Sequence, residues 1–171
     1  MNEITLPSHK YLDGRGLEYK KISFPITTEK GAANVAKILG FREEQIIKTL
    51  IFEVVQTKEK VLIMIASNKS AISGNLKKIL GSKDIKMATL DDVQKTTGYV
   101  VGSIPPFSWQ PLNFRTFIDK GLMSEEQLGV GSGQWGEEII IKPADLVNAS
   151  NSKIVNLTEP MILITKKNIF N

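Results

Sequence analysis

Hydrophobic residues recur along this chain with two periods, and segments of each kind alternate from one end to the other. Two β-rich runs, at 48–56 and 60–67, flank a three-residue polar turn and predict a β-hairpin. Apolar residues at helical spacing stop at Gly40, Gly81 and Gly98, and glycine is typical of the position just after a helix. The pattern therefore predicts short helices interleaved with short strands.

The remaining elements follow from the same two periods. Thr28 and Thr89 each precede an apolar helical pattern, so each is expected to cap a helix. Helices or helical turns are expected at 8–16, 28–40, 42–47, 73–80, 89–98 and 143–148, and strands at 17–24, 48–56, 60–67, 85–88, 99–102, 116–119, 127–130, 138–141, 154–157 and 161–165. This order favours an α/β fold with a mixed sheet over a doubly wound parallel sheet.

The length of 171 residues suits a single domain, 1–171, with one sizeable core. The longest apolar run, 61–66, is far shorter than the ~20 residues of a membrane span. The first residues carry no basic region followed by an apolar one, so no signal peptide is expected. We therefore expect one cytoplasmic domain with no membrane segment.

Cysteine is absent, and His9 is the single histidine. The absence of cysteine excludes disulfides, cysteine-ligated zinc, thiol catalysis and iron–sulfur clusters. One histidine also leaves few routes to a histidine-rich metal site or a serine–histidine triad. His9 lies in a polar segment near the chain start, and we expect it to be exposed and non-catalytic. No metal and no cofactor are expected.

Basic residues are concentrated in the first half of the chain. Residues 1–86 carry 15 Lys and Arg against 9 Asp and Glu, whereas residues 87–171 carry 7 against 9. A one-sided basic surface attracts polyanions such as nucleic acid, but ordinary solvated helix faces give the same count. Only three of the 22 basic residues are arginine, so bidentate arginine clamps are not the obvious binding mode. Charge alone leaves both interpretations open.

Lys48 is an unusual residue for its position. Strand periodicity places it on one face with Leu50, Phe52 and Val54, which are all apolar. Lysine is rarely buried without a partner. Either Lys48 sits at the mouth of the strand and extends outward, or its ammonium points into a pocket toward an anion.

Two glycine-containing loops are the other candidates for chemistry. In Gly102–Pro106, a glycine allows a ligand close to the backbone and two prolines stiffen the loop, so fixed amides are available to an oxyanion. A rigid surface turn is the plainer interpretation.

The segment Gly131–Gly136 matches the dinucleotide fingerprint G-x-G-x-x-G, but a β-type run follows where the fingerprint requires a helix. We expect a loop between strands there, either lining a pocket or forming a plain hairpin.

Several motifs in one order resemble the YbaK-type aminoacyl-tRNA deacylases, which are related to the editing insertion domain of bacterial prolyl-tRNA synthetases. The motifs are Ala36–Gly40, Lys48–Leu50, Leu76–Gly81, Thr97–Gly102 with Pro106 closing a G-x-x-x-P loop, Gly131–Gly136 and Ile141–Leu146. They span roughly residues 20–150. Each motif is weak alone, and the ordered set is specific.

The resemblance implies a mostly antiparallel, barrel-like α/β domain that hydrolyses the ester joining a wrong amino acid to tRNA, chiefly proline tRNA. In that family the lysine matching Lys48 holds the phosphate of the terminal adenosine, and backbone amides of the loop matching Gly102–Pro106 position the aminoacyl carbonyl. The 2′-hydroxyl of the tRNA or the substrate side chain assists the attacking water, so no metal or cofactor is implied. The implied partners are the acceptor end of aminoacyl-tRNA and, in addition, a synthetase.

The site residues expected on this basis are Lys48 and Gly102 as catalytic positions, and Thr49, Ser103, Ile104, Pro105, Pro106, Gly131, Ser132 and Glu138 as substrate-binding positions. The amino acid to be removed stays open. The cysteine-clearing branch has an aromatic residue near the position of Gly31 and Ser-Gly-Gly where this chain has Gly131–Gly133, and the alanine-clearing branches tend to place a histidine in this loop, which this chain lacks. A non-catalytic relative that binds tRNA or a small anion is the alternative function, and a scaffold docked on a synthetase is a third.

Overall fold

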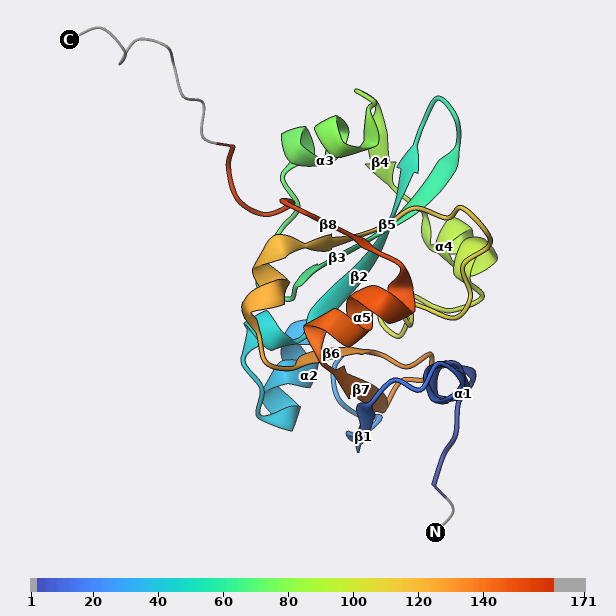
Figure 1. The fold of residues 1–171 in the computed structure, drawn as a ribbon, viewed down its shortest axis with the longest axis vertical. Helices are drawn as coiled ribbons and strands as arrows, with labels where there is room; N and C mark the ends of the chain where they lie inside the picture. Colours follow the sequence, from blue (N-terminus) through green and yellow to red (C-terminus); the bar gives the residue numbers. More distant parts are fainter. Residues whose placement is uncertain (1–2, 162–171) are drawn as a thin grey trace, which may run out of the picture.

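The computed structural model describes residues 3–161 (Figure 1). The helices are α1 (Pro7–Gly14), α2 (Ala32–Leu39), α3 (Ser73–Leu80), α4 (Leu90–Thr97) and α5 (Pro143–Ser150), with short 3₁₀ turns at Glu43–Gln45 and Lys120–Ser124. The strands are β1 (Tyr19–Ser23), β2 (Ile47–Val54), β3 (Glu59–Ala66), β4 (Ile85–Met87), β5 (Thr116–Asp119), β6 (Leu128–Gly131), β7 (Glu137–Ile141) and β8 (Lys153–Val155). The strand expected at 161–165 lies outside the described residues except for Met161.

Two sheets make up the β structure. The larger has the order β4-β2-β3-β5-β8, with the predicted β2–β3 hairpin at its centre, and the smaller has the order β1-β7-β6. Pairing is antiparallel except for β3–β5 and β5–β8. The two sheets meet at a bridge between Ile46 and Gly129. The α/β fold with mixed sheets is confirmed, but the sheets do not close into a barrel within residues 3–161.

Strand β3 separates two hydrophobic cores. Leu62 and Met64 face the small sheet, whereas Ile63 and Ile65 face α3, and all four side chains are fully buried. Burying one such side chain stabilises the fold by about 1.5–3 kcal/mol. The β2–β3 hairpin is therefore a rigid base from which site residues can project.

The helix ends confirm most of the local predictions. Gly40, Gly81 and Gly98 each adopt the left-handed conformation just after α2, α3 and α4. Thr89 caps α4, because its Oγ1 accepts a hydrogen bond from the Asp92 N–H at 3.1 Å. The prediction for Thr28 is wrong: α2 begins later, at Ala32, with Gly31 at the N-cap position.

The strand expected at 99–102 is also wrong. The segment forms a turn instead, in which the Ser103 N–H donates to the Val100 carbonyl at 3.4 Å and Gly102 has a φ of +100°. A strand needs a neighbour to receive its backbone hydrogen bonds, and Val100 and Val101 are exposed at the surface with none beside them. The segment is therefore a turn that leads directly into the Gly102–Pro106 loop.

His9 is fully buried, so the expectation that it is exposed is wrong. Its Nδ1 accepts the Leu6 N–H at 2.9 Å, and its ring stacks on Tyr19 at 5.7 Å. Burial lowers the pKa of this imidazole, with nearby Lys21 acting in the same direction. The histidine fastens α1 to β1, a contact that its polar sequence neighbours did not indicate.

Candidate functional site

Lys48 lies near the start of β2 on the predicted face, because Leu50, Phe52 and Val54 belong to the core under α3. Its side chain is partly buried. The Nζ donates a hydrogen bond to the carbonyl oxygen of Lys69, in the loop that follows β3. The ammonium group is thus held at the end of the strand rather than extended freely into solvent.

The charge of Lys48 has no ion-pair partner within residues 3–161. Burial lowers the pKa of its ammonium group. Taking a cation out of water without a counter-charge is unfavourable. A bound anion such as a phosphate would supply the missing negative charge.

The Gly102–Pro106 loop is packed directly against the glycine loop. Ser103 to Pro106 are buried, whereas Gly102 is exposed. The Gly133 N–H donates to the Ser103 carbonyl at 2.8 Å. A Cβ at Gly131 would lie 2.8 Å from the carbonyl oxygen of Ile104, so this position requires glycine. The structure therefore brings two of the predicted segments together.

Three carbonyl groups of this loop accept hydrogen bonds, those of Ser103, Pro105 and Pro106, whereas two of its amides donate none to the backbone. The N–H groups of Gly102 and Ile104 donate to no backbone acceptor in the part of the chain that the structure describes. Proline has no N–H, so Pro105 and Pro106 add none. Within residues 3–161, two amides of this loop are therefore left without a backbone acceptor.

Strand β6 connects the lysine to the loop. Gly129 and Gly131 share one face of β6, and a side chain at Gly129 would overlap Ile46, two residues before Lys48. Gly131 contacts the Gly102–Pro106 loop, as described above. The alternation Leu-Gly-Val-Gly is a signal that could have indicated Gly129, because glycine inside a strand often marks a close approach.

Glu138 of β7 lies against the same glycine face. One of its carboxylate oxygens would be 3.5 Å from a Cβ at Gly129, and the residue is only 6% exposed. Burial raises the pKa of this carboxyl well above its ordinary value. The group therefore retains a proton more readily than a surface glutamate, and a cationic ligand nearby would favour its ionised form.

Two of the predicted residues are placed differently. Strand alternation puts Thr49 on the opposite face of β2 from Lys48, and its buried Oγ1 has no hydrogen-bond partner in the described structure. Ser132 is 1% exposed, and its Oγ donates to the Glu137 carbonyl at 2.8 Å. Its hydroxyl closes the glycine loop from within rather than opening into a pocket.

The G-x-G-x-x-G segment forms a loop between β6 and β7, as predicted from the β-type run after it. A dinucleotide fingerprint needs a helix N-terminus at that point for the pyrophosphate. The structure has β7 there. In addition, no group of three or more Asp, Glu, His or Cys side chains within residues 3–161 is arranged to hold a metal ion.

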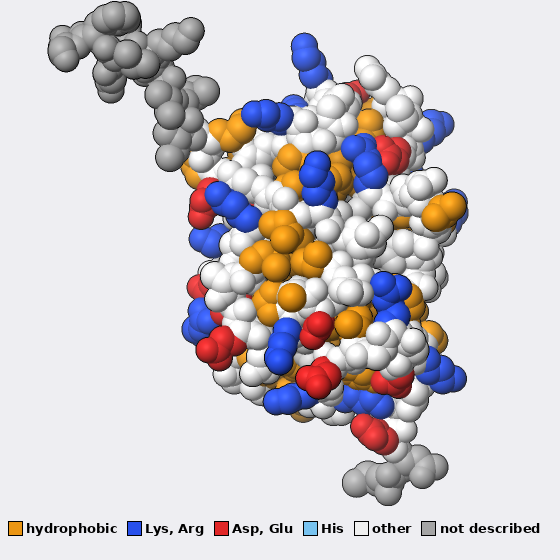
Figure 2. All heavy atoms as spheres, in the orientation of Figure 1, with side chains coloured by type: hydrophobic (Ala, Val, Ile, Leu, Met, Phe, Trp, Pro, Cys, Tyr) orange, Lys and Arg blue, Asp and Glu red, His pale blue; other side chains and the backbone are white. Residues whose placement is uncertain are grey.

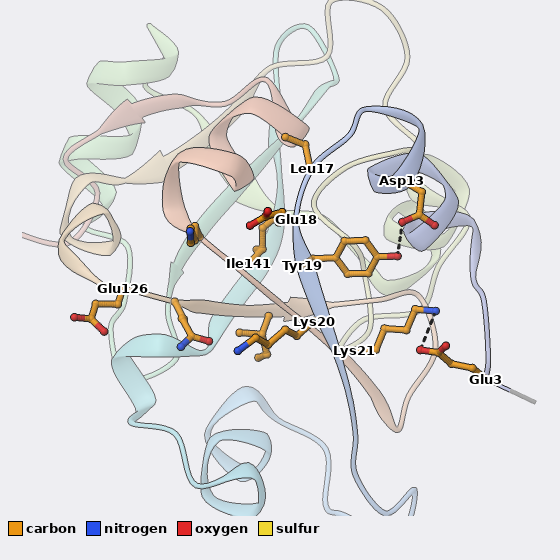
Figure 3. Close-up of a pocket in the computed structure, with 12 residues that line it drawn as sticks. Glu3, Asp13, Leu17, Glu18, Tyr19, Lys20, Lys21, Glu126 and Ile141 are labelled. Atoms are coloured by element: carbon orange, nitrogen blue, oxygen red, sulfur yellow. Dashed lines mark hydrogen bonds and ion pairs between the residues drawn. The ribbon is translucent and has the colours of Figure 1, made fainter. Parts of the chain in front are cut away.

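One cavity lies elsewhere, lined by β1, by the end of β7 and by the residues just before β6 (Figure 3). Its volume is about 930 Å³, and both acidic and basic side chains line it, including Asp13, Lys20 and Glu126. Burial and the hydrogen bond to Asp13 raise the pKa of Tyr19 in its wall to about 12. None of the predicted site residues lines this cavity, so it is distinct from the site around Lys48.

The acidic side chains are not spread evenly over the surface. In the face shown by Figure 2, acidic and basic side chains lie together at the β1 end, while the end around α3 and β4 carries mostly Lys and Arg. Lys77 and Lys78 lie in the last turn of α3, and Lys86 lies in β4. Among the helices described, none has the length and apolarity needed to cross a membrane.

Comparison with known proteins identifies the family of this chain. The profile of the aminoacyl-tRNA editing domain matches residues 28–149. A candidate Cys-tRNA(Pro)/Cys-tRNA(Cys) deacylase from Enterococcus faecalis is 27% identical over 141 residues, which cover 82% of this chain and 85% of the relative. A proline–tRNA ligase from Staphylococcus aureus is 28% identical over 134 residues, 78% of this chain but only 22% of the ligase.

Solved structures show the same fold. A hypothetical protein, APE2540, superposes with a TM-score of 0.80 at 25% identity and covers 90% of this chain and 99% of its own. A candidate trans-editing enzyme for prolyl tRNA synthetase gives a TM-score of 0.80 at 20% identity, covering 92% and 100%. The profile match spans most of the chain and includes both loops and Lys48. The chain belongs to the aminoacyl-tRNA editing domain family, which confirms the expected enzyme class of aminoacyl-tRNA deacylases.

Proposed function

We propose that this protein is a trans-editing hydrolase that removes a small wrong amino acid from mischarged tRNA, with proline tRNA as the principal acceptor. The observation that carries the proposal is Lys48, a partly buried cation with no counter-charge in the described structure. It stands beside a strand of glycines that leads to a loop with available amides. The names of the relatives from Enterococcus faecalis and Staphylococcus aureus point to the same substrates.

In this proposal Lys48 binds the phosphate of the terminal adenosine. A phosphate at Nζ supplies the counter-charge that the site lacks, so binding is favoured by charge and by relief of the desolvation cost. Anchoring the phosphate also fixes the position of the ester, and well-placed reactants account for a large part of enzymatic rate enhancement. Lys48 therefore acts by placement rather than as a nucleophile.

The amides of Gly102 and Ile104 then receive the aminoacyl carbonyl. Water attacks the carbonyl carbon, and negative charge develops on the oxygen that faces these N–H groups. The bond to the ribose oxygen breaks, and that oxygen takes a proton as the free hydroxyl. Because no histidine or cysteine lies at the loop, a hydroxyl of the substrate itself is proposed to assist the water.

The glycine face of β6 and Glu138 are proposed to hold the amino acid. Gly129 and Gly131 allow Ile46 and the Ile104 carbonyl to pack closely against β6, which keeps the space for the amino acid small, and the Glu138 carboxyl is proposed to receive the substrate's ammonium group. Size discrimination among small side chains is worth only ~1–3 kcal/mol. The site therefore suits a set of small amino acids rather than one.

The basic end around α3 and β4 is proposed to meet the acceptor stem. Its lysines contact phosphates, so binding should weaken as salt rises. Since charged tRNA is consumed by translation, this substrate also implies a cytoplasmic protein. A synthetase that hands over tRNA would be a further partner.

Deacylation of a panel of mischarged tRNAs tests the proposal. Alanyl, cysteinyl, seryl and threonyl esters of proline tRNA are offered to the wild type, to Lys48→Ala and to Lys153→Ala, a control lysine that is exposed in β8. We expect turnover of at least one ester, lost in Lys48→Ala and kept in the control. Salt-dependent tRNA binding without turnover would instead establish the alternative, a non-catalytic tRNA- or anion-binding module. If the protein shows neither turnover nor tRNA binding, both the proposed hydrolase and the binding module are refuted.

A further inference from the structure

Helix α1 lies outside the segment that matches the editing domain, which begins at residue 28, yet its side chains reach both loops of the proposed site. We propose that α1 is a clamp on these loops, in which Ser8 and Tyr11 are positioning residues for the ester. The inference rests on the proposed function for its catalytic consequence. Its structural part can be measured without a substrate.

Ser8 controls one peptide group of the glycine loop. The side chain is fully buried, and its Oγ donates to the carbonyl of Ser132 at 2.5 Å. The N–H of the same peptide unit belongs to Gly133 and donates to the Ser103 carbonyl at 2.8 Å. Because a peptide group is planar, fixing its carbonyl also fixes the direction of its N–H. Ser8 therefore holds Ser103 through a single rigid plane.

The position of Gly133 makes this restraint necessary. Its φ is +101°, a region that glycine enters without strain, so the peptide before it can rotate at low cost. When a peptide carbonyl accepts a hydrogen bond, the N–H of the same peptide unit becomes more polarised, which strengthens the hydrogen bond that this N–H donates. Loss of the Ser8 hydroxyl would weaken both restraints at once. The Gly102–Pro106 loop would then sample more than one position.

Tyr11 holds the other end of that loop. Its ring stacks on Phe107 with centroids 5.7 Å apart and planes inclined by 10°, and Phe107 is fully buried directly after Pro106. The Tyr11 hydroxyl donates to the Ala149 carbonyl of α5 at 2.8 Å. The ring is therefore fixed from two sides. Together, Ser8 and Tyr11 hold the loop at Ser103, between the amides of Gly102 and Ile104, and at Phe107, after them.

The body of α1 is anchored well enough to act as a clamp. Leu12 is completely buried in the core between the sheets, and His9 stacks on β1. Figure 1 shows α1 at the side of the small sheet, beside β7. The contact between Ser8 and Ser132 joins residues 124 positions apart, so it forms only when the whole domain has folded.

The test compares Ser8→Ala with Ser150→Ala. Ser150 is also buried, and it donates a similar bond, 2.7 Å to the Leu146 carbonyl, but it touches neither loop. We measure the thermal midpoint, kcat, KM and the NMR hydrogen-exchange rate of the Gly133 amide for both variants. Displacement of reacting groups by about 1 Å costs as much as 100-fold in rate, so kcat should fall about 10- to 100-fold in Ser8→Ala with KM for tRNA nearly unchanged.

In Ser8→Ala the Gly133 amide should exchange about 10-fold faster or more, which corresponds to the loss of roughly one hydrogen bond. In Ser150→Ala the midpoint should fall by a similar amount while kcat and Gly133 exchange stay at wild-type values. Tyr11→Phe, which keeps the stacked ring, should retain activity that Tyr11→Leu loses. Unchanged Gly133 exchange in Ser8→Ala, or an equal change in Ser150→Ala, would overturn the clamp. If the wild type turns over no ester, the proposed function fails and the exchange rates still decide the clamp.

Discussion

The two ends of β2 differ in whether their charged side chains have partners of opposite charge. At one end Glu53 is 7% exposed and lies between Lys60, at 2.6 Å, and Lys86, at 3.5 Å. The hydrogen bond from Lys60 is the main reason why the pKa of Glu53 is lowered. At the other end Lys48 has no described carboxylate partner, and burial lowers its pKa. One end of the strand is electrostatically complete, and the other lacks a negative charge.

This difference separates an ion-paired structural cluster around Glu53 from the proposed functional site around Lys48. The Glu53 carboxylate is paired with lysines on both neighbouring strands, β3 and β4, so its burial leaves no uncompensated negative charge. Among residues 3–161, the Lys48 end holds a cation without an ion-pair partner and a carboxyl with a raised pKa, both of which are unfavourable for folding. Such local conflicts are expected where a ligand supplies the missing partner.

Replacing the lysine should have the largest effect. Lys48→Met keeps most of the apolar stem and removes the charge, so deacylation should fall about 100-fold or more, as for the loss of an electrostatic contact in other active sites. The thermal midpoint should stay the same or rise, because an uncompensated cation is lost. Steady-state deacylation and thermal unfolding measure both quantities. If Lys48→Met is less stable than the wild type but fully active, Lys48 has a structural role and the proposed functional role is wrong.

A methyl group at the functional end should be the next most damaging change. In Gly131→Ala the new Cβ meets the backbone carbonyl of Ile104 at 2.8 Å, and overpacking of this kind costs about 1–3 kcal/mol. The Gly102–Pro106 loop should shift and activity should fall with it. Gly74→Ala is the control, because nothing lies within 4 Å of its Cβ and the helix should gain up to about 1 kcal/mol. Urea unfolding and deacylation report the two effects.

The two buried glutamates should give opposite pH dependences. The pKa of Glu138 is raised above its ordinary 4.5, so the folded protein holds this proton more tightly and stability falls as pH rises above 4.5 toward the raised value. The pKa of Glu53 is lowered, so its contribution is present above 4.5 and is lost as pH falls through the folded value. Glu138→Gln should remove the first slope and Glu53→Gln the second. Urea midpoints from about pH 2 to pH 8 give both slopes. Equal slopes in the two variants would contradict this pairing.

The smallest effect concerns His9, which packs α1 against Tyr19 of β1. Its pKa is lowered from 6.5, so its contribution to stability is present above pH 6.5 and is lost as pH falls through the folded value. The charges around it are Lys21, which opposes protonation, and Glu137, Asp13 and Glu3, which favour it. Amides of α1 should exchange faster relative to those of α3 on acidification. His9→Gln, which stays neutral, should abolish this difference.

The sequence alone determined the features that depend on neighbours along the chain. The β2–β3 hairpin, the glycine ends of α2, α3 and α4, and the cap at Thr89 are all local, because each is stabilised within a few residues. The alternation of β2 also predicted the face on which Lys48 lies. The family followed from the order of its motifs. These predictions required no knowledge of which segments meet in space.

The tertiary structure alone decided what each polar group meets. Whether Lys48 had a partner depended on a loop 21 residues away, and the burial of His9 depended on how α1 docks. The turn at 99–102 resulted from the absence of a neighbouring strand, which no local pattern records. The bond from Ser8 to Ser132 spans 124 residues. Such contacts form only after the chain has paid the entropy of bringing distant segments together, so local propensity cannot predict them.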